Sequence, residues 1–338
     1  MTSPIILDCA GPELTPDERA LYRERQPFGF ILFARHCLTP EQVKALVAEL
    51  KDAVGRDVPI LIDQEGGRVA RLCPPHWRRP PAAAAFAALW EVDEDAAVRA
   101  AWINSRLIAA ELAAVGVTVD CLPVLDLRFA GAHQIIGDRA YGDKPEPVIA
   151  LGRAAAEGLL AGGVVPVIKH IPGHGRAAAD SHLELPRVSA PLEALRRLDF
   201  APFAALNDMP AAMTAHIVYD ALDSDTPATW SRAVVQNTIR QEIGFKGTLM
   251  SDDITMKALD GPLATRAQRS LEAGCDLVLL CNADFEERRE VLDATPPLAP
   301  ADFQRLDKLM TPPPPEPADL TALRLELDKL LTPQEISR

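Results

Sequence analysis

The side chains best suited to chemistry are concentrated in one stretch, Lys169 to Pro186, which reads KHIPGHGRAAADSHLELP. Its first fourteen residues include Lys169, His170, His174, Asp180 and His182. The apolar run before it, residues 164–168, is typical of a buried strand, and a proline and two glycines then end the regular structure. Titratable groups gathered at a strand end predict a functional site, although a polar surface loop could have the same composition.

Eight short apolar runs along the chain are each followed by a helical pattern. The runs cover residues 5–7, 29–33, 58–62, 117–125, 164–168, 211–214, 248–250 and 276–280. This alternation predicts an α/β fold with a parallel sheet, and the count of eight predicts a single closed (β/α)8 barrel. An open doubly wound sheet could also hold eight strands, but no GxGxxG pattern follows the first run.

Polar residues stand where these runs end. They are Asp8, Asp63, Asp126, Lys169, His170, His216, Asp252 and Asn282. Barrel enzymes build their active sites at the carboxyl ends of the strands, so we expect these side chains to lie at one end of the barrel.

The barrel is expected to occupy residues 1–295, followed by a proline-rich tail over residues 296–338. Within the tail, Leu320 to Leu331 has leucines at helical spacing. We therefore expect a terminal helix packed on the outside of the barrel.

The charge and the cysteines restrict the possible partners and the compartment. The 338 residues carry a net charge of −13, which argues against nucleic acid or an anionic membrane as a partner. The six cysteines form no CxxC pair, and four lie in or beside apolar runs, as buried free thiols of a reducing compartment do. The first residues lack the basic segment of a signal peptide, so we expect a cytoplasmic protein, and we expect it to be a monomer.

Five motifs together resemble the β-N-acetylhexosaminidases of glycoside hydrolase family 3, and the resemblance runs from about residue 5 to about residue 290. The motifs are DQEGGRVAR at 63–71, IIGDRAYG at 135–142, KHIPGHG at 169–175, DSH at 180–182 and GTLMSDDITM at 247–256. Members of this family are single-barrel enzymes that remove N-acetylglucosamine from cell-wall fragments during bacterial peptidoglycan recycling. The resemblance implies a retaining exo-β-N-acetylglucosaminidase that acts on muropeptides and needs no cofactor or metal.

The resemblance also assigns the catalytic residues. Asp252 corresponds to the nucleophile, the carboxylate that a retaining glycosidase needs to form a covalent glycosyl-enzyme. The neighbouring Asp253 remains an alternative, with Asp252 then capping the next helix. His182, held by Asp180, corresponds to the general acid/base, in place of the second carboxylic acid of most glycosidases. A purely structural hydrogen bond between His182 and Asp180 is the other interpretation.

Five residues match the substrate-binding positions of the family. They are Asp63, Arg71, Arg139, Lys169 and His170. Charged partners such as Asp63 and Lys169 form strong hydrogen bonds with sugar hydroxyls, whereas the arginines could equally serve as salt-bridge partners that hold loops. We expect His174 to shape its loop, with a role in the site as the alternative, and Asp126 to orient loops or Arg139. His216 could line the pocket or be a satisfied core histidine.

Other functions remain open at this point. Phosphate could replace water as the acceptor in an N-acetylglucosaminidase of the same family, or the substrate could be a β-glucoside. A metal-dependent barrel hydrolase would need three or four ligands converging on one point, and Asp8 stands alone at the end of the first run. A non-catalytic sugar-binding relative would lack the nucleophile or the acid/base, and both are present in this sequence.

Overall fold

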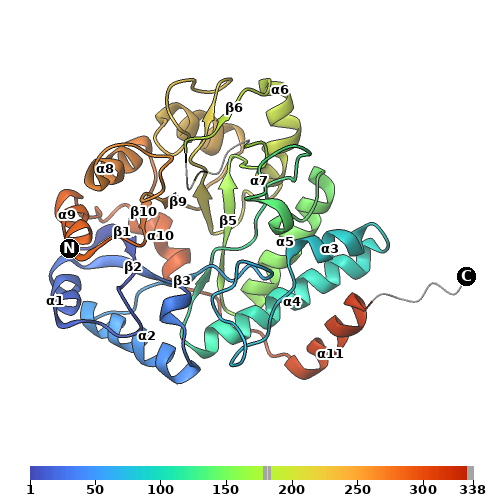
Figure 1. Cartoon of the computed structure of the whole chain (residues 1–338), viewed down its shortest axis with the longest axis horizontal. Coiled ribbons are helices and arrows are strands. Elements are labelled where there is room, and N and C mark those ends of the chain that lie inside the picture. The colour runs from blue at the N-terminus through green and yellow to red at the C-terminus, as the bar shows by residue number, and fades with distance from the viewer. Residues whose placement is uncertain (178–180, 182–183, 333–338) are drawn as a thin grey trace, which may run out of the picture.

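Eight parallel strands close into a barrel in the computed structural model, which describes residues 1–177, 181 and 184–332. Neighbouring strands follow the order β1, β10, β9, β7, β5, β4, β3 and β2 around the barrel. Their bounds are Ser3–Leu7 (β1), Pro27–Leu32 (β2), Ile60–Ile62 (β3), Val119–Asp120 (β4), Val165–Ile171 (β5), Ala211–Thr214 (β7), Thr248–Asp253 (β9) and Leu277–Leu280 (β10). Figure 1 shows the strands at the centre with helices around them. The predicted (β/α)8 barrel is confirmed.

Helices cover the outside of the barrel. They are α1 (Pro16–Arg25), α2 (Pro40–Val54), α3 (Ala83–Trp90), α4 (Glu94–Ala114), α5 (Pro145–Ala161), α6 (Leu192–Ala194), α7 (Ala201–Ala205), α8 (Leu263–Ala273) and α9 (Phe285–Ala294). The start of α1 follows from its sequence: the Thr15 side chain accepts a hydrogen bond from the Glu18 backbone N–H, and the Glu18 carboxylate accepts one from the Thr15 backbone N–H. This capping box satisfies two backbone donors that would otherwise lack partners.

Side chains fill the barrel, and the tail closes one end of it. On β1, Ile6 points into the barrel while Ile5 and Leu7 pack against the surrounding helices, as the alternation of a strand requires. Leu306 and Leu309 of α10 (Phe303–Met310) join the inner cluster. Thr248, the first residue of β9, donates a hydrogen bond to the Arg305 carbonyl at 2.7 Å. The helix α10 therefore closes the amino-terminal end of the barrel, opposite the strand ends that carry the polar residues.

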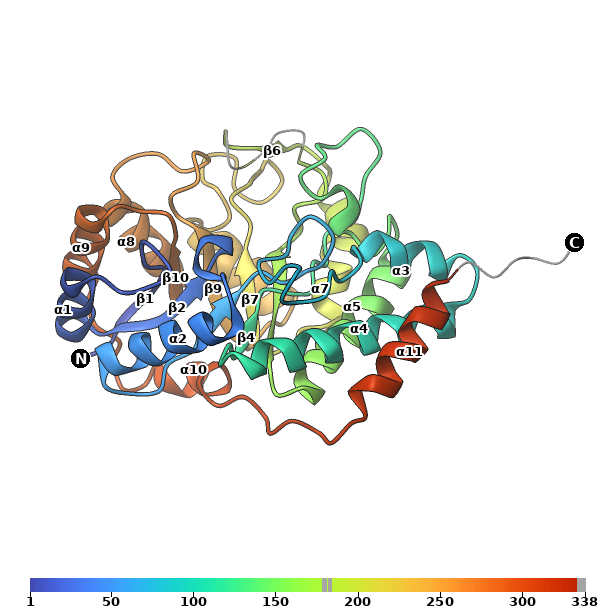
Figure 2. The same ribbon diagram turned by 60° about the horizontal axis from the view of Figure 1, so that its bottom comes forward.

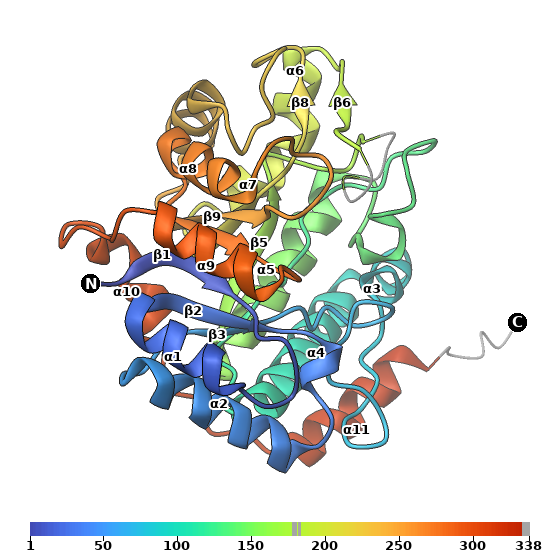
Figure 3. The same cartoon turned by 60° about the vertical axis from the view of Figure 1, so that its left-hand side comes forward.

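The last helix, α11 (Leu320–Leu331), lies against α4, as Figure 2 shows. Leu323 and Leu327 are buried there, and Arg99 of α4 pairs with Glu326 at 2.8 Å. Figure 3, in which the left-hand side of Figure 1 comes forward, shows α1, α2 and α9 around β1 and β2. No helix of residues 1–177 or 184–332 is long and apolar enough to cross a membrane.

Three predicted elements differ from the structure. The fourth strand, predicted over residues 117–125, is regular only at Val119–Asp120, because Pro123 has no backbone N–H to donate to a neighbouring strand. The helix predicted near residues 192–206 is interrupted by a π-helical turn over Leu195–Asp199. The helix predicted from Ser231 is wound as a π-helix over Val234–Glu242. In addition, β6 (Arg187–Val188) and β8 (Val218–Tyr219) form a small separate sheet.

Candidate active site

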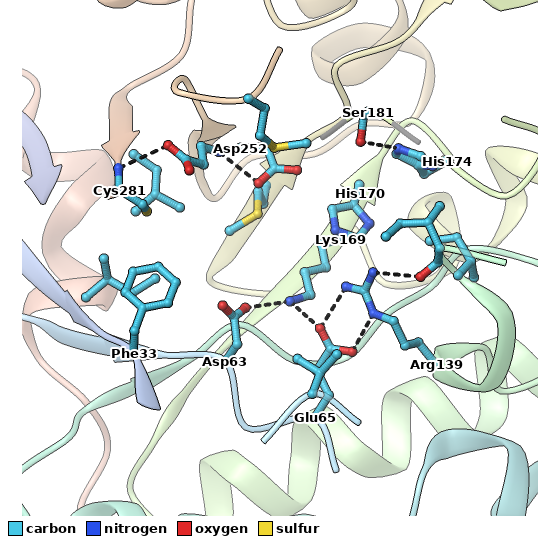
Figure 4. A pocket seen from close by; sticks show the side chains of 18 of the residues that line it. Phe33, Asp63, Glu65, Arg139, Lys169, His170, His174, Ser181, Asp252 and Cys281 are labelled. Atoms are coloured by element: carbon cyan, nitrogen blue, oxygen red, sulfur yellow. Dashed lines mark hydrogen bonds and ion pairs between the residues drawn. The ribbon is translucent and has the colours of Figure 1, made fainter. Parts of the chain in front are cut away.

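A pocket of about 290 Å³ opens at the carboxyl ends of the strands. Six predicted site residues line it: Asp63, Arg71, Arg139, Lys169, His170 and Asp252. The other two, Asp180 and His182, lie outside the described residues, but Ser181 between them is described and lines the pocket. Figure 4 shows the labelled side chains of the pocket converging from several strand ends.

One wall of the pocket is a network of buried ions around Lys169. Its ammonium Nζ lies 2.8 Å from Asp63 Oδ1 and 2.6 Å from Glu65 Oε1. Arg139 binds the same Glu65 carboxylate through Nε and Nη2, both at 2.8 Å. Burial alone would lower the pKa of Lys169, but the Asp63 and Glu65 carboxylates outweigh it and hold that pKa well above its usual range.

Glu65 was not predicted as a site residue. Burial alone would raise its pKa, but Arg139 and Lys169 lower the pKa to about 2, so the carboxylate is ionised. The sequence did contain a signal, because Glu65 lies two positions after Asp63, and alternate residues of an extended chain point to the same side.

Arg71 combines both roles considered for it. Its Nη2 donates to Asp63 Oδ2 at 3.1 Å, so it is a salt-bridge partner, and its side chain also lines the pocket. The guanidinium lies 5.5 Å from the ring centroid of Phe33, which lines the pocket as well. Phe33 was not singled out in the sequence.

Asp126 positions two histidines from beneath the pocket. One of its oxygens lies 2.6 Å from His170 Nδ1, and the other accepts a hydrogen bond from the His174 backbone N–H at 2.6 Å. Burial would raise the pKa of Asp126, but His170 and these hydrogen bonds outweigh it and lower the pKa. The expected orienting role therefore has a physical basis, and it is directed at the histidines: among the described residues Asp126 makes no hydrogen bond to Arg139.

The two adjacent carboxylates on β9 have different surroundings. Asp253 accepts hydrogen bonds from Thr255 N at 3.0 Å, Thr255 Oγ1 at 2.7 Å and Cys281 N at 3.0 Å. Asp252 accepts one, from the Asp253 backbone N–H at 2.8 Å, and within the described part of the chain its other oxygen has no hydrogen-bond donor. Asp253 thus acts as a fixed support, while one Asp252 oxygen receives no hydrogen bond from residues 1–177, 181 or 184–332 and could bind a ligand.

The protonation of this pair follows from the same surroundings. For Asp252, burial would raise the pKa, but His170 and His216 outweigh it and the net shift is downward. For Asp253, burial outweighs the hydrogen bonds and raises the pKa to about 6. Asp252 therefore loses its proton more readily than Asp253 and is the more fully ionised of the two at neutral pH.

His216 is a satisfied core histidine. Its Nδ1 lies 2.7 Å from Thr229 Oγ1 and its Nε2 lies 3.0 Å from the Asp253 carbonyl oxygen. It is fully buried and is not among the residues that line the pocket. Of the two interpretations drawn from the sequence, the geometry supports the structural one.

The carboxylate of the remaining strand-end acid, Asp8, is also bound by other residues of the protein. Arg35 and Arg288 both pair with it, and its carboxylate accepts the Asn282 backbone N–H at 2.8 Å. Across residues 1–177, 181 and 184–332, no group of three or more His, Cys, Asp or Glu side chains is arranged to hold a metal ion.

Comparison with known proteins places these features in a family. Residues 13–302 match the N-terminal domain of glycosyl hydrolase family 3. A β-hexosaminidase of Alkalilimnicola ehrlichii is 40% identical over 83% of this chain and 81% of its own, and one of Bordetella avium is 38% identical over 87% and 85%. The crystal structure of NagZ from Neisseria gonorrhoeae in complex with N-trifluoroacetyl-D-glucosamine superposes with a TM-score of 0.89 at 34% identity, covering 98% of this chain and 99% of that one. The chain belongs to the β-hexosaminidases of glycoside hydrolase family 3.

Proposed function

We propose that the protein is a retaining exo-β-N-acetylglucosaminidase that removes terminal N-acetylglucosamine from muropeptides. The observation that carries the proposal is the ionised Asp252, one oxygen of which has no donor among the described residues; it lines a pocket whose other wall is the network around Lys169. A pocket of about 290 Å³ is at the small end of ligand sites, which suits one terminal sugar better than a long chain.

In the first step Asp252 attacks the anomeric carbon, and the bond between that carbon and the glycosidic oxygen breaks. The leaving oxygen takes a proton from the general acid. In the second step water attacks the glycosyl-enzyme, gives its proton to the same group, and releases the sugar with its original configuration. Two inversions at one carbon give overall retention.

The acid/base is the part of the proposal that rests on the resemblance. His182 held by Asp180 would fill this role, and it is supported by Ser181, the residue between them in the sequence, which lines the pocket. An imidazole titrates near neutral pH, so it can give a proton as the imidazolium in the first step and take one back as the neutral ring in the second.

The Lys169 network would bind the hydroxyls of the terminal sugar. Asp63 and Glu65 are ionised acceptors, while Lys169 and Arg139 are charged donors, and hydrogen bonds of charged groups are stronger than those between neutral groups. The four charges already satisfy one another before substrate arrives, so their positions are fixed and little ordering is needed on binding.

The test is the release of nitrophenol from 4-nitrophenyl N-acetyl-β-D-glucosaminide and from the matching β-glucoside. We expect the first substrate to be preferred, and Asp252→Ala to lower kcat by more than about a thousandfold. Asp260→Ala, which removes a carboxylate whose side chain is 91% exposed, is the matched control and should leave the rate unchanged.

Three other results would change the proposal. A preference for the glucoside would replace the substrate, and a rate that depends on phosphate, with a sugar phosphate as product, would replace hydrolysis by phosphorolysis. Release of N-acetylglucosamine from nitrophenyl glycosides but not from a disaccharide–peptide fragment of peptidoglycan would refute the muropeptide substrate.

A further inference from the structure

Ser181 is held at the pocket wall from two sides. Its Oγ lies 3.1 Å from His174 Nε2, and its backbone carbonyl accepts a hydrogen bond from the Ala258 N–H at 3.2 Å. The side chain is buried and lines the pocket, and Figure 4 shows it next to the His174 ring. A serine with an ordinary surface role would not need two anchors from separate parts of the chain.

Contacts with residues other than Ser181 also hold His174 in place. Its backbone N–H donates to Asp126 at 2.6 Å, and its ring stands edge-on to His170 with 5.5 Å between centroids. Burial and the neighbouring His170 lower the pKa of His174 to about 4, so the ring is neutral at neutral pH. A neutral imidazole carries its hydrogen on only one of its two nitrogens.

The surroundings of the ring determine which nitrogen that is. Nδ1 is buried and has no hydrogen-bond partner in the described part of the chain. A hydrogen on Nδ1 would therefore be a buried donor without an acceptor, which proteins avoid more strictly than an unmet acceptor. The hydrogen belongs on Nε2, where it is donated to Ser181 Oγ.

This assignment fixes the direction of the serine hydroxyl. Because Ser181 Oγ accepts from His174, its own hydrogen is available for a second acceptor. Over residues 1–177, 181 and 184–332, His174 is the only hydrogen-bond partner of that oxygen, and the atom lies on the wall of a pocket. The pair is also unsuited to act as nucleophile and base, because a nitrogen that already holds a hydrogen cannot take the serine proton.

We infer that Ser181 is a sugar-binding residue whose hydroxyl donates a hydrogen bond to an oxygen of the terminal sugar, with His174 as the positioning residue. The inference rests on the proposed function, because the acceptor is an oxygen of the bound glycoside. It adds a neutral hydroxyl donor beside the charged donors Lys169 and Arg139, and it assigns the buried His174 ring a positioning role.

The first test compares Ser181→Ala with the wild type on 4-nitrophenyl N-acetyl-β-D-glucosaminide and on its 3-deoxy, 4-deoxy and 6-deoxy analogues. Loss of one neutral hydrogen bond should lower kcat/KM on the parent substrate by roughly 3- to 10-fold. On the analogue that lacks the acceptor oxygen, the ratio of wild-type to variant kcat/KM should fall to about one. If no analogue does so, the same series is run with a thioglycoside inhibitor to test the glycosidic oxygen by its binding constant.

The second test uses His174. His174→Leu should reproduce the loss seen in Ser181→Ala and add little to it in the double variant, whereas His174→Gln, whose amide N–H can take the place of Nε2–H, should restore part of the activity. Ser224→Ala, which alters an exposed serine, is the control, and equal melting temperatures show that the variants are folded.

The results separate this inference from the proposed function. The wild-type rate on the parent glycoside tests the proposed function. If the enzyme prefers glucosides, wild type and Ser181→Ala are compared on the deoxy analogues of the glucoside instead. An unchanged kcat/KM in Ser181→Ala, or an equal loss on all analogues and on inhibitor binding, would overturn the role of the hydroxyl even when the enzyme hydrolyses N-acetylglucosaminides.

Discussion

Replacement of Lys169 by methionine tests whether the network on the pocket wall is held together by this one ammonium group. The Lys169 side chain is 2% exposed, and its Nζ contacts the carboxylates of both Asp63 and Glu65. Removing one partner of a buried ion pair typically costs about 3 to 5 kcal/mol, because the other charge stays buried. Arg71 and Arg139 remain beside the two carboxylates, so we expect the lower value, about 3 kcal/mol in the free energy of unfolding.

The effect should depend on pH in a defined direction. The pKa of Glu65 is lowered from 4.5 to about 2, so its stabilising contribution is complete above pH 4.5 and is lost as the pH falls toward 2. Without Lys169 the folded-state pKa of Glu65 rises and less of this contribution exists. The difference in unfolding free energy between wild type and Lys169→Met should therefore shrink as the pH falls below about 4.5.

Urea denaturation at pH 7 and pH 4, followed by tryptophan fluorescence, measures this difference. Lys44→Met changes an exposed lysine of α2 and should alter the unfolding free energy by less than about 0.5 kcal/mol. Adding Glu65→Gln to Lys169→Met removes one of the two carboxylate charges that Lys169 contacts, and it should recover part of the lost unfolding free energy. A loss below about 1 kcal/mol at pH 7, or an equal loss at both pH values, would refute the reasoning.

Three further predictions concern other buried acids. Burial raises the pKa of Asp120 to about 8, so the wild type loses stability as the pH rises from about 4 to 8. Asp120→Asn keeps the shape of the side chain but does not titrate, so its unfolding free energy relative to wild type should rise by about 2 kcal/mol or more between pH 5.5 and pH 8. Denaturant melts measure this, and the same pH dependence in both proteins would contradict it. Asp253→Asn should lower stability more than Asp252→Asn does, since Asp253 accepts three hydrogen bonds, and equal melting temperatures would count against its supporting role. Asp126→Asn should lower kcat by at least about tenfold through misplacement of His170 and His174, and wild-type kinetics in that variant would exclude the positioning role.

The sequence was sufficient to predict the barrel and to place the candidate active site at one end of it. Both follow from local patterns: apolar runs separated by helical segments, and a polar residue where each run ends. Lys169 and Asp63 are good examples: Lys169 lies near the carboxyl end of β5 and Asp63 directly follows β3, so the barrel topology brings them to one rim. The two residues form an ion pair although they are 106 positions apart in the sequence.

Other features depend on contacts that no local pattern contains. The choice between Asp252 and Asp253 is decided in part by the backbone N–H of Cys281, which is 28 residues away and reaches Asp253 only because β9 and β10 are neighbours. The π-helical windings at Leu195–Asp199 and Val234–Glu242 likewise have no signature in the helical periodicity, which is nearly the same for α- and π-turns over one or two turns.

In the proposed mechanism Asp252 forms a covalent bond with the sugar, and this bond can be trapped. A 2-acetamido-2-deoxy-5-fluoro-β-glucosyl fluoride slows the second step more than the first, so the glycosyl-enzyme should accumulate. Mass spectrometry of the intact protein should show one added sugar, and peptide mapping should place it on Asp252. A label on Asp253, or an inactivated enzyme with no covalent sugar, would contradict the account.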